Sequence, residues 1–417
     1  MKIGIYGISS QSGKAYLADL LSRGVRVVGY ARATTHGTAV VDAILNEKGI
    51  YLNRPSNTNN EESRFIDLGQ SIVTSDIKLL VDESDVIIIA VPSNFHEEIA
   101  IELKQYLNNR SIPFLLSPSR TIASPYLWNI LGENYPIVCF STSPFSCKSL
   151  SDNTVYIKRR KRTWLASFEG SFTSTSIHFI KGLFPQVTFT DIPALTSLNN
   201  IGAIFHPTAY ILNLEEINKR NQENRPFSFY MEGIANKPEV GLIIEKIDQT
   251  RLEIADKLGI PTFGLKSNPR EDIWRRITNA LRSLEEENEN DIDVLRKTRG
   301  YFLEYINHCV ISAQHWLDIT YGVIRIPDEN LAQAIARTPT YQTNSVPQER
   351  YVDEDIPTGL VPLEALAKKI KINHLEITHI INAFDIIKNT DIRHTGRNLE
   401  KLKDFDVINY LKGNTNE

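Results

Sequence analysis

The opening of the chain reads as an apolar strand, a glycine-containing turn, a helix and a second apolar strand. Residues 2–6 form a short apolar run that ends at Gly7, a helix-like pattern continues to Gly24, and residues 25–30 are again apolar. Two short apolar runs on either side of one helix are typical of a β-α-β unit, whose strands lie parallel in one sheet. A parallel sheet needs helices on its faces, so this opening predicts an α/β domain.

The same alternation continues through the first half of the chain. A helix is expected at residues 96–107, and further strands are expected at residues 78–80, 85–91, 113–116, 137–140, 155–157 and 164–167. The run 85–91 is apolar after its first residue, which suits a parallel strand buried on both faces. The pattern predicts a Rossmann-like, doubly wound α/β domain, and we place it at residues 1–183.

The second half has the periodicity of helices. Apolar residues recur at helical spacing between Val240 and Leu258, before Gly259 ends the pattern. Further helices are expected at residues 301–317, 363–370 and 375–387. Residues 184–417 are therefore expected to form a mainly α-helical second domain.

Length and composition limit the class of protein. A chain of 417 residues with 41% hydrophobic and 23% charged residues suits two globular domains. The net charge of −4 argues against non-specific binding to nucleic acid or to a membrane surface, and no apolar stretch has the length of a transmembrane helix. The three cysteines form no CxxC motif and no even-numbered disulfide framework. We therefore expect a cytoplasmic protein without a bound metal.

The turn after the first strand reads GISSQSG, residues 7–13. A Rossmann turn has the pattern GxGxxG, whereas this chain has a serine at the second glycine and one extra residue before the third. The position between a strand and a helix still favours a dinucleotide site, with the pyrophosphate on the helix N-terminus. A strand–helix connection without a ligand is the alternative. The candidate cofactor-binding residues of this turn are Gly7, Ser9, Ser10, Gln11, Ser12 and Gly13.

The end of the second strand bears on the choice of cofactor. In NAD-binding domains an acidic residue roughly 20 positions after the glycine turn binds the ribose 2′-hydroxyl. Here Tyr30 is followed by Ala31 and Arg32, and no carboxylate is present. Arg32 could pair with the 2′-phosphate of NADP(H), or it could be a surface arginine without a ligand. We expect NADP(H) to be preferred, with NAD(H) possible.

Two segments in the second half resemble a known family. One reads LNNIGAIFHP at residues 198–207, and the other reads RYVDEDIPTGLVP at residues 350–362. Both are similar to hallmark segments of the octopine/nopaline-type opine dehydrogenases, and FYMEG at residues 229–233 also resembles that family. The resemblance covers nearly the whole chain. It is interrupted at about residues 264–313, which we interpret as an insertion.

The resemblance implies roles for individual residues. His206 and Asp355 correspond to the catalytic pair, and Arg350 is implied to bind a substrate carboxylate. The segment 144–148 resembles one near the amino-acid site, which makes Cys147 a candidate for substrate binding. Val91 and Pro92, after a predicted strand, are implied to line the cofactor site. Where the family often has asparagine, four residues before the histidine, this chain has Gly202.

The implied activity is that of an NAD(P)-dependent oxidoreductase acting on CH–NH bonds. An amino acid and a 2-oxo acid condense to an imine, which is reduced by hydride. A histidine titrates near neutrality and can remove the proton of the ammonium group, while a carboxylate orients its ring. The partners are then small molecules, with a homodimer as a possible assembly. Taken singly, these side chains could also be a helix cap, a turn residue and an ordinary ion-pair partner.

Two other functions are compatible with these patterns. One is a related two-domain NAD(P)-dependent 2-hydroxy or 2-oxo acid reductase that needs no amine, and the other is a non-catalytic dinucleotide-binding sensor. A short basic run at residues 158–162, between two predicted strands, has no role in any of these functions. A phosphate or acidic partner is possible there, and a solvated turn is the simpler interpretation.

Overall fold

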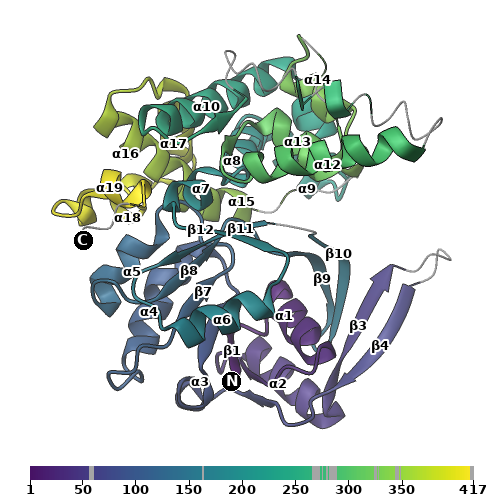
Figure 1. Cartoon of the computed structure of the whole chain (residues 1–417), viewed down its shortest axis with the longest axis vertical. Helices are drawn as coiled ribbons and strands as arrows, with labels where there is room; N and C mark the ends of the chain where they lie inside the picture. Colours follow the sequence, from purple (N-terminus) through teal and green to yellow (C-terminus); the bar gives the residue numbers. More distant parts are fainter. Residues whose placement is uncertain are drawn as a thin grey trace. The chain divides into compact units, whose positions relative to one another are not determined.

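The computed structural model describes residues 1–55, 61–161, 164–264, 273–274, 276–278, 280, 289–323, 326, 328–342, 347 and 349–413 (Figure 1). The chain divides into two compact units, Met1–Thr196 and Ser197–Glu417. This division falls later than the expected boundary at residue 183. The reason is that α6 (Ser174–Leu183) is followed by β12 (Val187–Thr190), which pairs with β11 (Trp164–Glu169) in the sheet of the first unit.

The first unit is built on an eight-stranded sheet of order β12-β11-β8-β7-β6-β1-β2-β5. Its other strands are β1 (Ile3–Tyr6), β2 (Val27–Tyr30), β5 (Ile72–Thr74), β6 (Val86–Ile89), β7 (Phe114–Leu116) and β8 (Ile137–Phe140). Neighbouring strands are parallel except that β11 runs antiparallel to β8. From β1 the sheet extends through β2 and β5 on one side and through β6, β7 and β8 on the other, which confirms the doubly wound, Rossmann-like fold.

Helices cover both faces of this sheet. On one face, a single apolar cluster joins the sheet to α1 (Gln11–Ser22), α2 (Thr35–Glu47) and α6. The remaining helices are α3 (Ile77–Glu83), α4 (His96–Lys104) and α5 (Ala123–Leu131), and Figure 1 shows α4 beside α5. The strand expected at residues 78–80 is wrong, because these residues lie in α3. Asp76 caps that helix by accepting from the amides of Lys78 and Leu79.

A second, four-stranded sheet has the order β4-β3-β10-β9. Its strands are β3 (Gly49–Pro55), β4 (Glu61–Asp67), β9 (Phe145–Ser151) and β10 (Thr154–Arg160). Only residues 155–157 of this sheet were expected as a strand. The sheet packs against α1, where the buried Lys14 donates to Ser149 Oγ and to the Ser151 carbonyl, both at 2.7 Å.

The second unit is mainly helical, as expected. Its α-helices are α8 (Gly202–Ile211), α9 (Leu214–Gln222), α10 (Pro238–Lys257), α12 (Glu289–Ile306), α13 (Ala313–Tyr321), α14 (Leu331–Ala336), α15 (Arg350–Asp355), α16 (Val361–Ile370), α17 (Leu375–Lys388), α18 (Ile392–Thr395) and α19 (Val407–Leu411), while α7 (Pro193–Leu198) spans the division between the units. Within the described residues, no helix has the length and apolar character needed to cross a bilayer.

The helix expected at residues 301–317 is interrupted. The chain leaves α12 at Ile306, forms the short strand β14 (Val310–Ile311) beside β13 (Thr262–Phe263), and re-enters a helix at α13. Ser312 causes the new start, because its side chain accepts from the His315 amide as an N-cap. Much of the proposed insertion at about residues 264–313 lies outside the described residues. Its described part contributes Trp274, Ile306 and Cys309 to a small apolar cluster with Phe263.

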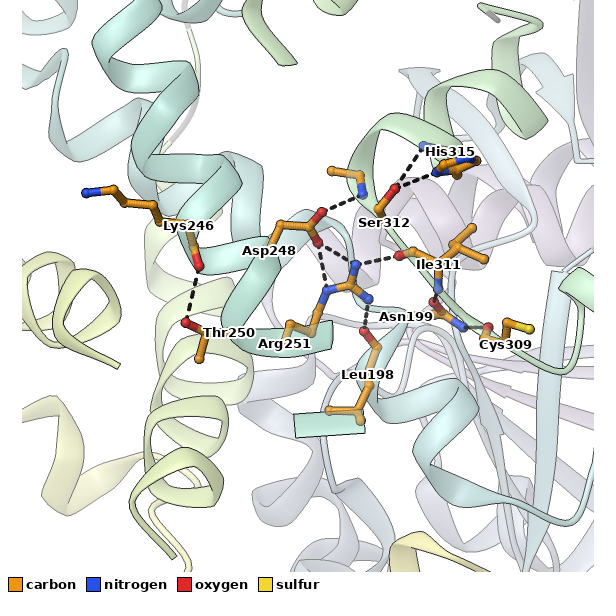
Figure 2. Close-up of polar contacts among 11 residues, drawn as sticks. Leu198, Asn199, Lys246, Asp248, Thr250, Arg251, Cys309, Ile311, Ser312 and His315 are labelled. Carbon is orange, nitrogen blue, oxygen red and sulfur yellow. Dashed lines mark hydrogen bonds and ion pairs between the residues drawn. The ribbon is translucent and has the colours of Figure 1, made fainter. Parts of the chain in front are cut away.

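Arg251 lies at the centre of a buried polar network in the second unit (Figure 2). Its guanidinium donates to the Asp248 carboxylate in α10 and to the backbone carbonyls of Leu198 and Ile311. The second oxygen of Asp248 accepts from the Ala313 amide at 2.7 Å. A buried guanidinium needs such partners because its desolvation is otherwise uncompensated. The network therefore fixes the segment that leads into α8 against α10 and β14.

Candidate active site

The turn between β1 and α1 lies at the carboxyl end of β1, where the strand order reverses. Gly7 has a φ of +99°, and a β carbon there would lie 2.5 Å from Val91 Cγ1. At Gly13 a β carbon would lie 2.0 Å from the carbonyl oxygen of Gly7. Gly7 thus permits the tight turn and Gly13 the close packing of helix on strand. Two of the three glycine roles of a Rossmann turn are kept despite the longer spacing.

Ser10 caps α1 and ties it to the neighbouring strand. Its Oγ accepts from the Gly13 amide at 2.9 Å and donates to the Ala90 carbonyl at 2.7 Å. The first-turn amides of a helix have no intrahelical acceptor and carry the positive end of the helix dipole. Three further residues of this turn are half-buried, namely Ser9, Gln11 and Ser12. A helix N-terminus at the switch point of a doubly wound sheet suits a pyrophosphate.

The structure brings three other predicted residues of the first unit to this turn. Val91 follows β6 and lies against Gly7, with the half-buried Pro92 next in the chain. Cys147 in β9 is half-buried, and its thiol donates to the Gln11 carbonyl at 3.5 Å. The predicted cofactor residues of the turn therefore lie beside Val91 and Pro92 of the main sheet and beside Cys147 of the second sheet.

Arg32, at the end of β2, is held by acidic residues of α4. Its Nη2 lies 2.7 Å from Glu98 Oε1 and 3.0 Å from Glu102 Oε2, and its Nε donates to the Tyr6 hydroxyl at 2.6 Å. The Arg32 side chain is 39% exposed, so a phosphate can reach it from solvent. Such a phosphate would have to compete with two carboxylates. The sequence predicted an arginine at this edge without indicating these partners.

In the second unit, His206 and Asp355 form a close pair. His206 Nδ1 lies 2.7 Å from Asp355 Oδ2, although the two residues are 149 positions apart in the chain. The Asp355 side chain is 1% exposed and that of His206 is 20% exposed. This distance is typical of a charge-assisted hydrogen bond. With Nδ1 held by the carboxylate, Nε2 is the nitrogen that can act on a substrate.

Close packing of two helical segments brings this pair together. His206 is on α8, and Asp355 ends α15, which continues into the π-helical turn η4 (Ile356–Leu360). A β carbon at Gly359 would lie 2.4 Å from Ala203 Cβ, closer than side chains can approach. Glycine at this position therefore lets η4 approach α8 closely enough for the carboxylate to meet the imidazole.

Aromatic side chains surround the His206 ring. Tyr351 stacks on it with ring centroids 4.4 Å apart and an interplanar angle of 16°. The Tyr230 hydroxyl lies 3.2 Å from His206 Nε2, and Tyr341 stacks on Tyr230 at 3.7 Å. Burial, together with neighbouring groups that include Asp355, raises the pKa of Tyr230 well above its ordinary value. The hydroxyl therefore stays protonated and can donate to Nε2. The sequence prediction missed these aromatic contacts, because only packing reveals them.

Arg350 lies at the start of α15, on the same helix as Asp355. Arg350 is exposed, and its guanidinium carbon lies 5.8 Å from the centroid of the Tyr351 ring. Among the described residues it forms no ion pair, so its planar donors are available for a carboxylate. The structure thus brings His206, Asp355 and Arg350 to one region of the second unit.

Comparison with known proteins gives similar sequences and a similar fold. Residues 194–387 match the family model described as the α-helical domain of NAD/NADP octopine/nopaline dehydrogenase. An opine dehydrogenase of Arthrobacter sp. (strain 1C) is 27% identical over 339 residues, which cover 79% of this chain and 78% of the relative. The structure of octopine dehydrogenase with NADH and agmatine has a TM-score of 0.67 at 15% identity, covering 100% of this chain and 99% of that chain. Yersinopine dehydrogenase with NADP⁺ has a TM-score of 0.60 at 14% identity, covering 99% and 94%.

These matches agree with the positions of the candidate site residues in the two units. The family model spans His206 and Asp355, and both hallmark segments lie within it. The first unit supplies a dinucleotide-type turn on a doubly wound sheet. Over residues 194–387 the chain therefore resembles the α-helical domain of octopine/nopaline dehydrogenases, and most of its length is similar to an opine dehydrogenase.

Proposed function

We propose that the protein is an NAD(P)H-dependent opine dehydrogenase, which reductively joins an amino acid to a 2-oxo acid. The observation that carries this proposal is the 2.7 Å contact between His206 and Asp355 within the two family segments. Octopine dehydrogenase, whose fold is similar, has been solved in complexes with NADH and agmatine, NADH and L-arginine, and NADH and pyruvate. A non-catalytic sensor would not need the buried acid–imidazole pair.

The first task of the pair is to remove a proton from the amino acid. An ammonium group cannot attack a carbonyl, because its nitrogen has no free electron pair. His206 Nε2 accepts one proton from that ammonium, while Asp355 keeps Nδ1 protonated and stabilises the imidazolium. The freed amine then forms a carbon–nitrogen bond to the 2-oxo carbon, and the oxo group becomes a hydroxyl.

The second task is to return that proton. His206 donates it to the leaving hydroxyl, so that water departs and the carbon–nitrogen bond becomes a protonated imine. The nicotinamide, when bound, supplies the hydride that reduces this imine. Arg350 holds a substrate carboxylate through the planar donors of its guanidinium, which fixes the reacting carbon relative to Nε2. Tyr351 stacks on the imidazole ring and holds it in place during both proton transfers.

For the cofactor site we propose the turn of residues 7–13, with Val91 and Pro92 beside it. The glycine positions at Gly7 and Gly13 fit a dinucleotide-binding turn, and the N-terminus of α1 would bind the pyrophosphate. We further propose a preference for NADP(H), supported by Arg32 and by the absence of a carboxylate at the end of β2.

The cofactor preference is tested on Arg32 and its acidic partner Glu98. Arg32→Ala should raise KM for NADPH much more than KM for NADH, because only NADPH carries the 2′-phosphate. Glu98→Gln should lower KM for NADPH, since one competing carboxylate is removed from Arg32. Equal effects of Arg32→Ala on both cofactors, or a wild-type preference for NADH, would contradict the proposed preference.

The proposed function is tested with a matrix of amino acids and 2-oxo acids, assayed by oxidation of NADPH and NADH. We expect oxidation only when both substrates are present, with a secondary amine as the product by mass spectrometry. His206→Ala should lower turnover by on the order of a hundredfold. Oxidation with a 2-oxo acid alone would favour the reductase without an amine substrate. Cofactor binding without turnover for any pair would favour the sensor.

A further inference from the structure

Both ring nitrogens of His206 have partners within the second unit. Nδ1 lies 2.7 Å from Asp355 Oδ2, and Nε2 lies 3.2 Å from the Tyr230 hydroxyl. Because the carboxylate accepts from Nδ1, that nitrogen carries the proton of the neutral ring, and Nε2 has one lone pair. The Tyr230 hydroxyl therefore occupies the position at which His206 would accept a proton.

The Tyr230 ring is packed by other aromatic rings, which hold its hydroxyl beside Nε2. Tyr341 stacks on it with ring centroids 3.7 Å apart and an interplanar angle of 13°. Phe229 and Phe205 contact it edge to face, with centroids 5.2 and 6.4 Å from that of Tyr230. Turning the ring away from His206 would break these favourable contacts. We therefore expect the hydroxyl to stay on Nε2 when a substrate amine arrives.

A phenol hydroxyl can donate and accept hydrogen bonds at the same time, which the Nε2 lone pair cannot do. Its oxygen carries one hydrogen and two lone pairs. While Tyr230 donates to Nε2, one lone pair can accept from the Tyr341 hydroxyl, and the other is left for a further donor. The ammonium group of an amino acid is such a donor, and Tyr230 is only partly buried, so a ligand can reach it.

We propose that Tyr230 is a further catalytic residue, which contacts the substrate amine and relays protons between that amine and His206 Nε2. This inference rests on the proposed function, which supplies the amine and the need to remove its proton. It also gives a role to the FYMEG segment, residues 229–233, which contains Tyr230 and has no part in the proton transfers as described so far.

Two protons move in each transfer. In the first, an N–H bond of the ammonium breaks as its proton binds the Tyr230 oxygen, and the O–H bond of Tyr230 breaks as that proton binds Nε2. The amine and the phenol are then neutral, and the positive charge is on the imidazolium beside Asp355. In the second transfer Nε2 returns a proton to the Tyr230 oxygen, and Tyr230 gives its own proton to the leaving hydroxyl, which departs as water.

The surroundings of Tyr230 disfavour a separate phenolate. Burial, together with neighbouring groups that include Asp355, raises the pKa of its hydroxyl well above the ordinary value. The hydroxyl therefore passes a proton on only as it receives another. The charge is stored on His206 instead, where the Asp355 carboxylate stabilises it.

The relay is tested by binding, in calorimetric titrations of the full chain with its oxidised cofactor bound. The probes are the amino acid that reacts fastest in the substrate matrix and the same acid with hydrogen in place of its amino group. Tyr230→Phe removes the acceptor of the ammonium, so it should weaken amino-acid binding about ten- to a hundredfold, as expected for a lost charged hydrogen bond. Binding of the deaminated acid should not change. If the ammonium instead contacted Nε2 directly, Tyr230→Phe would expose that lone pair and tighten amino-acid binding.

Tyr210→Phe is the matched control for loss of a tyrosine hydroxyl. Tyr210 is a buried residue of α8, the helix of His206, and its hydroxyl forms no hydrogen bond with the described residues. Its amino-acid affinity and kcat should equal those of the wild type. Tyr230→Phe should lower kcat about a hundredfold and leave KM for the cofactor unchanged. Its thermal unfolding should be similar to that of the wild type, because phenylalanine keeps the stacked ring.

A second variant, His206→Ala, tests the relay even if Tyr230→Phe does not fold. It should abolish most turnover but change amino-acid affinity by less than about threefold, since the ammonium contacts the Tyr230 oxygen. A loss of about tenfold or more in this affinity would overturn the relay. Unchanged or tighter amino-acid binding in Tyr230→Phe, with turnover that still requires both substrates, would overturn it and leave the proposed function standing. Absence of turnover with every substrate pair would refute the proposed function, and the relay with it.

Discussion

Replacing Asp355 with asparagine removes the negative charge that contacts His206 and keeps the size of the side chain. Asp355 Oδ2 lies 2.7 Å from Nδ1, and its side chain is 1% exposed, so water cannot replace the lost carboxylate. Two unit charges about 4 Å apart attract by roughly 4 kcal/mol at an effective dielectric constant of 20. Because His206 is 20% exposed, water screens part of this attraction. We expect the imidazolium to lose about 3 kcal/mol of stabilisation, which lowers kcat about a hundredfold.

The assay is steady-state oxidation of NADPH at saturating amino acid and 2-oxo acid, with cofactor affinity measured by fluorescence titration. Cofactor affinity should not change, because the dinucleotide contacts lie in the other unit. Asp353→Asn is the matched control, since Asp353 is on the same helix and pairs with Lys388 at 3.5 Å on the surface. A kcat within threefold of the wild type for Asp355→Asn would refute this reasoning. An equal loss in Asp353→Asn would refute it as well.

Three further outcomes are expected. Arg350→Lys should raise KM for a carboxylate substrate with little change in kcat, because lysine lacks the bidentate fork; a changed kcat at constant KM would contradict this. Arg251→Met should lower the free energy of unfolding by about 3–5 kcal/mol in urea titrations, since a buried carboxylate loses its partner. Burial opposes ionisation of Glu364, but hydrogen bonds led by that from Arg393 outweigh it and hold its pKa at about 2, below the ordinary 4.5. The ionised Glu364 therefore stabilises the folded state above pH 4.5, and this stabilisation is lost as pH falls toward 2. Glu364→Gln should lower the free energy of unfolding by about 3 kcal/mol at pH 7 and make it depend less on pH below 4.5.

The main sheet could be predicted because its central strands are buried on both faces. Residues 86–91 and 137–140 are continuous apolar runs, and both contain strands of the structure. The run at residues 78–80 is too short to separate strand from helix, and the cap at Asp76 decides for the helix. The sheet of β3 and β4 was missed because its strands mix apolar with many polar residues.

The candidate site could be predicted only in part. The family segments pointed to His206 and Asp355, but no local pattern shows that residues 149 positions apart meet. Their contact depends on the close approach of η4 to α8 at Gly359. Likewise, Arg32 was expected at the cofactor edge, while its partners in α4 come from 66 and 70 positions away. Side-chain partners of this kind are set by tertiary packing, which a single sequence does not display.

The π-helical turn η4 sets the direction in which the Asp355 side chain points relative to α16. From α15 through η4 to α16 the chain is helical without a break, and the wide turn holds one residue more than an α-helical turn would. Each residue of an α-helix advances the side-chain direction by about 100°. Deleting a single residue of η4 would therefore rotate Asp355 by about that angle relative to α16 and turn its carboxylate away from His206. The extra residue in η4 therefore lets one continuous helical segment pack the apolar side chains of α16 and still direct the Asp355 carboxylate toward His206.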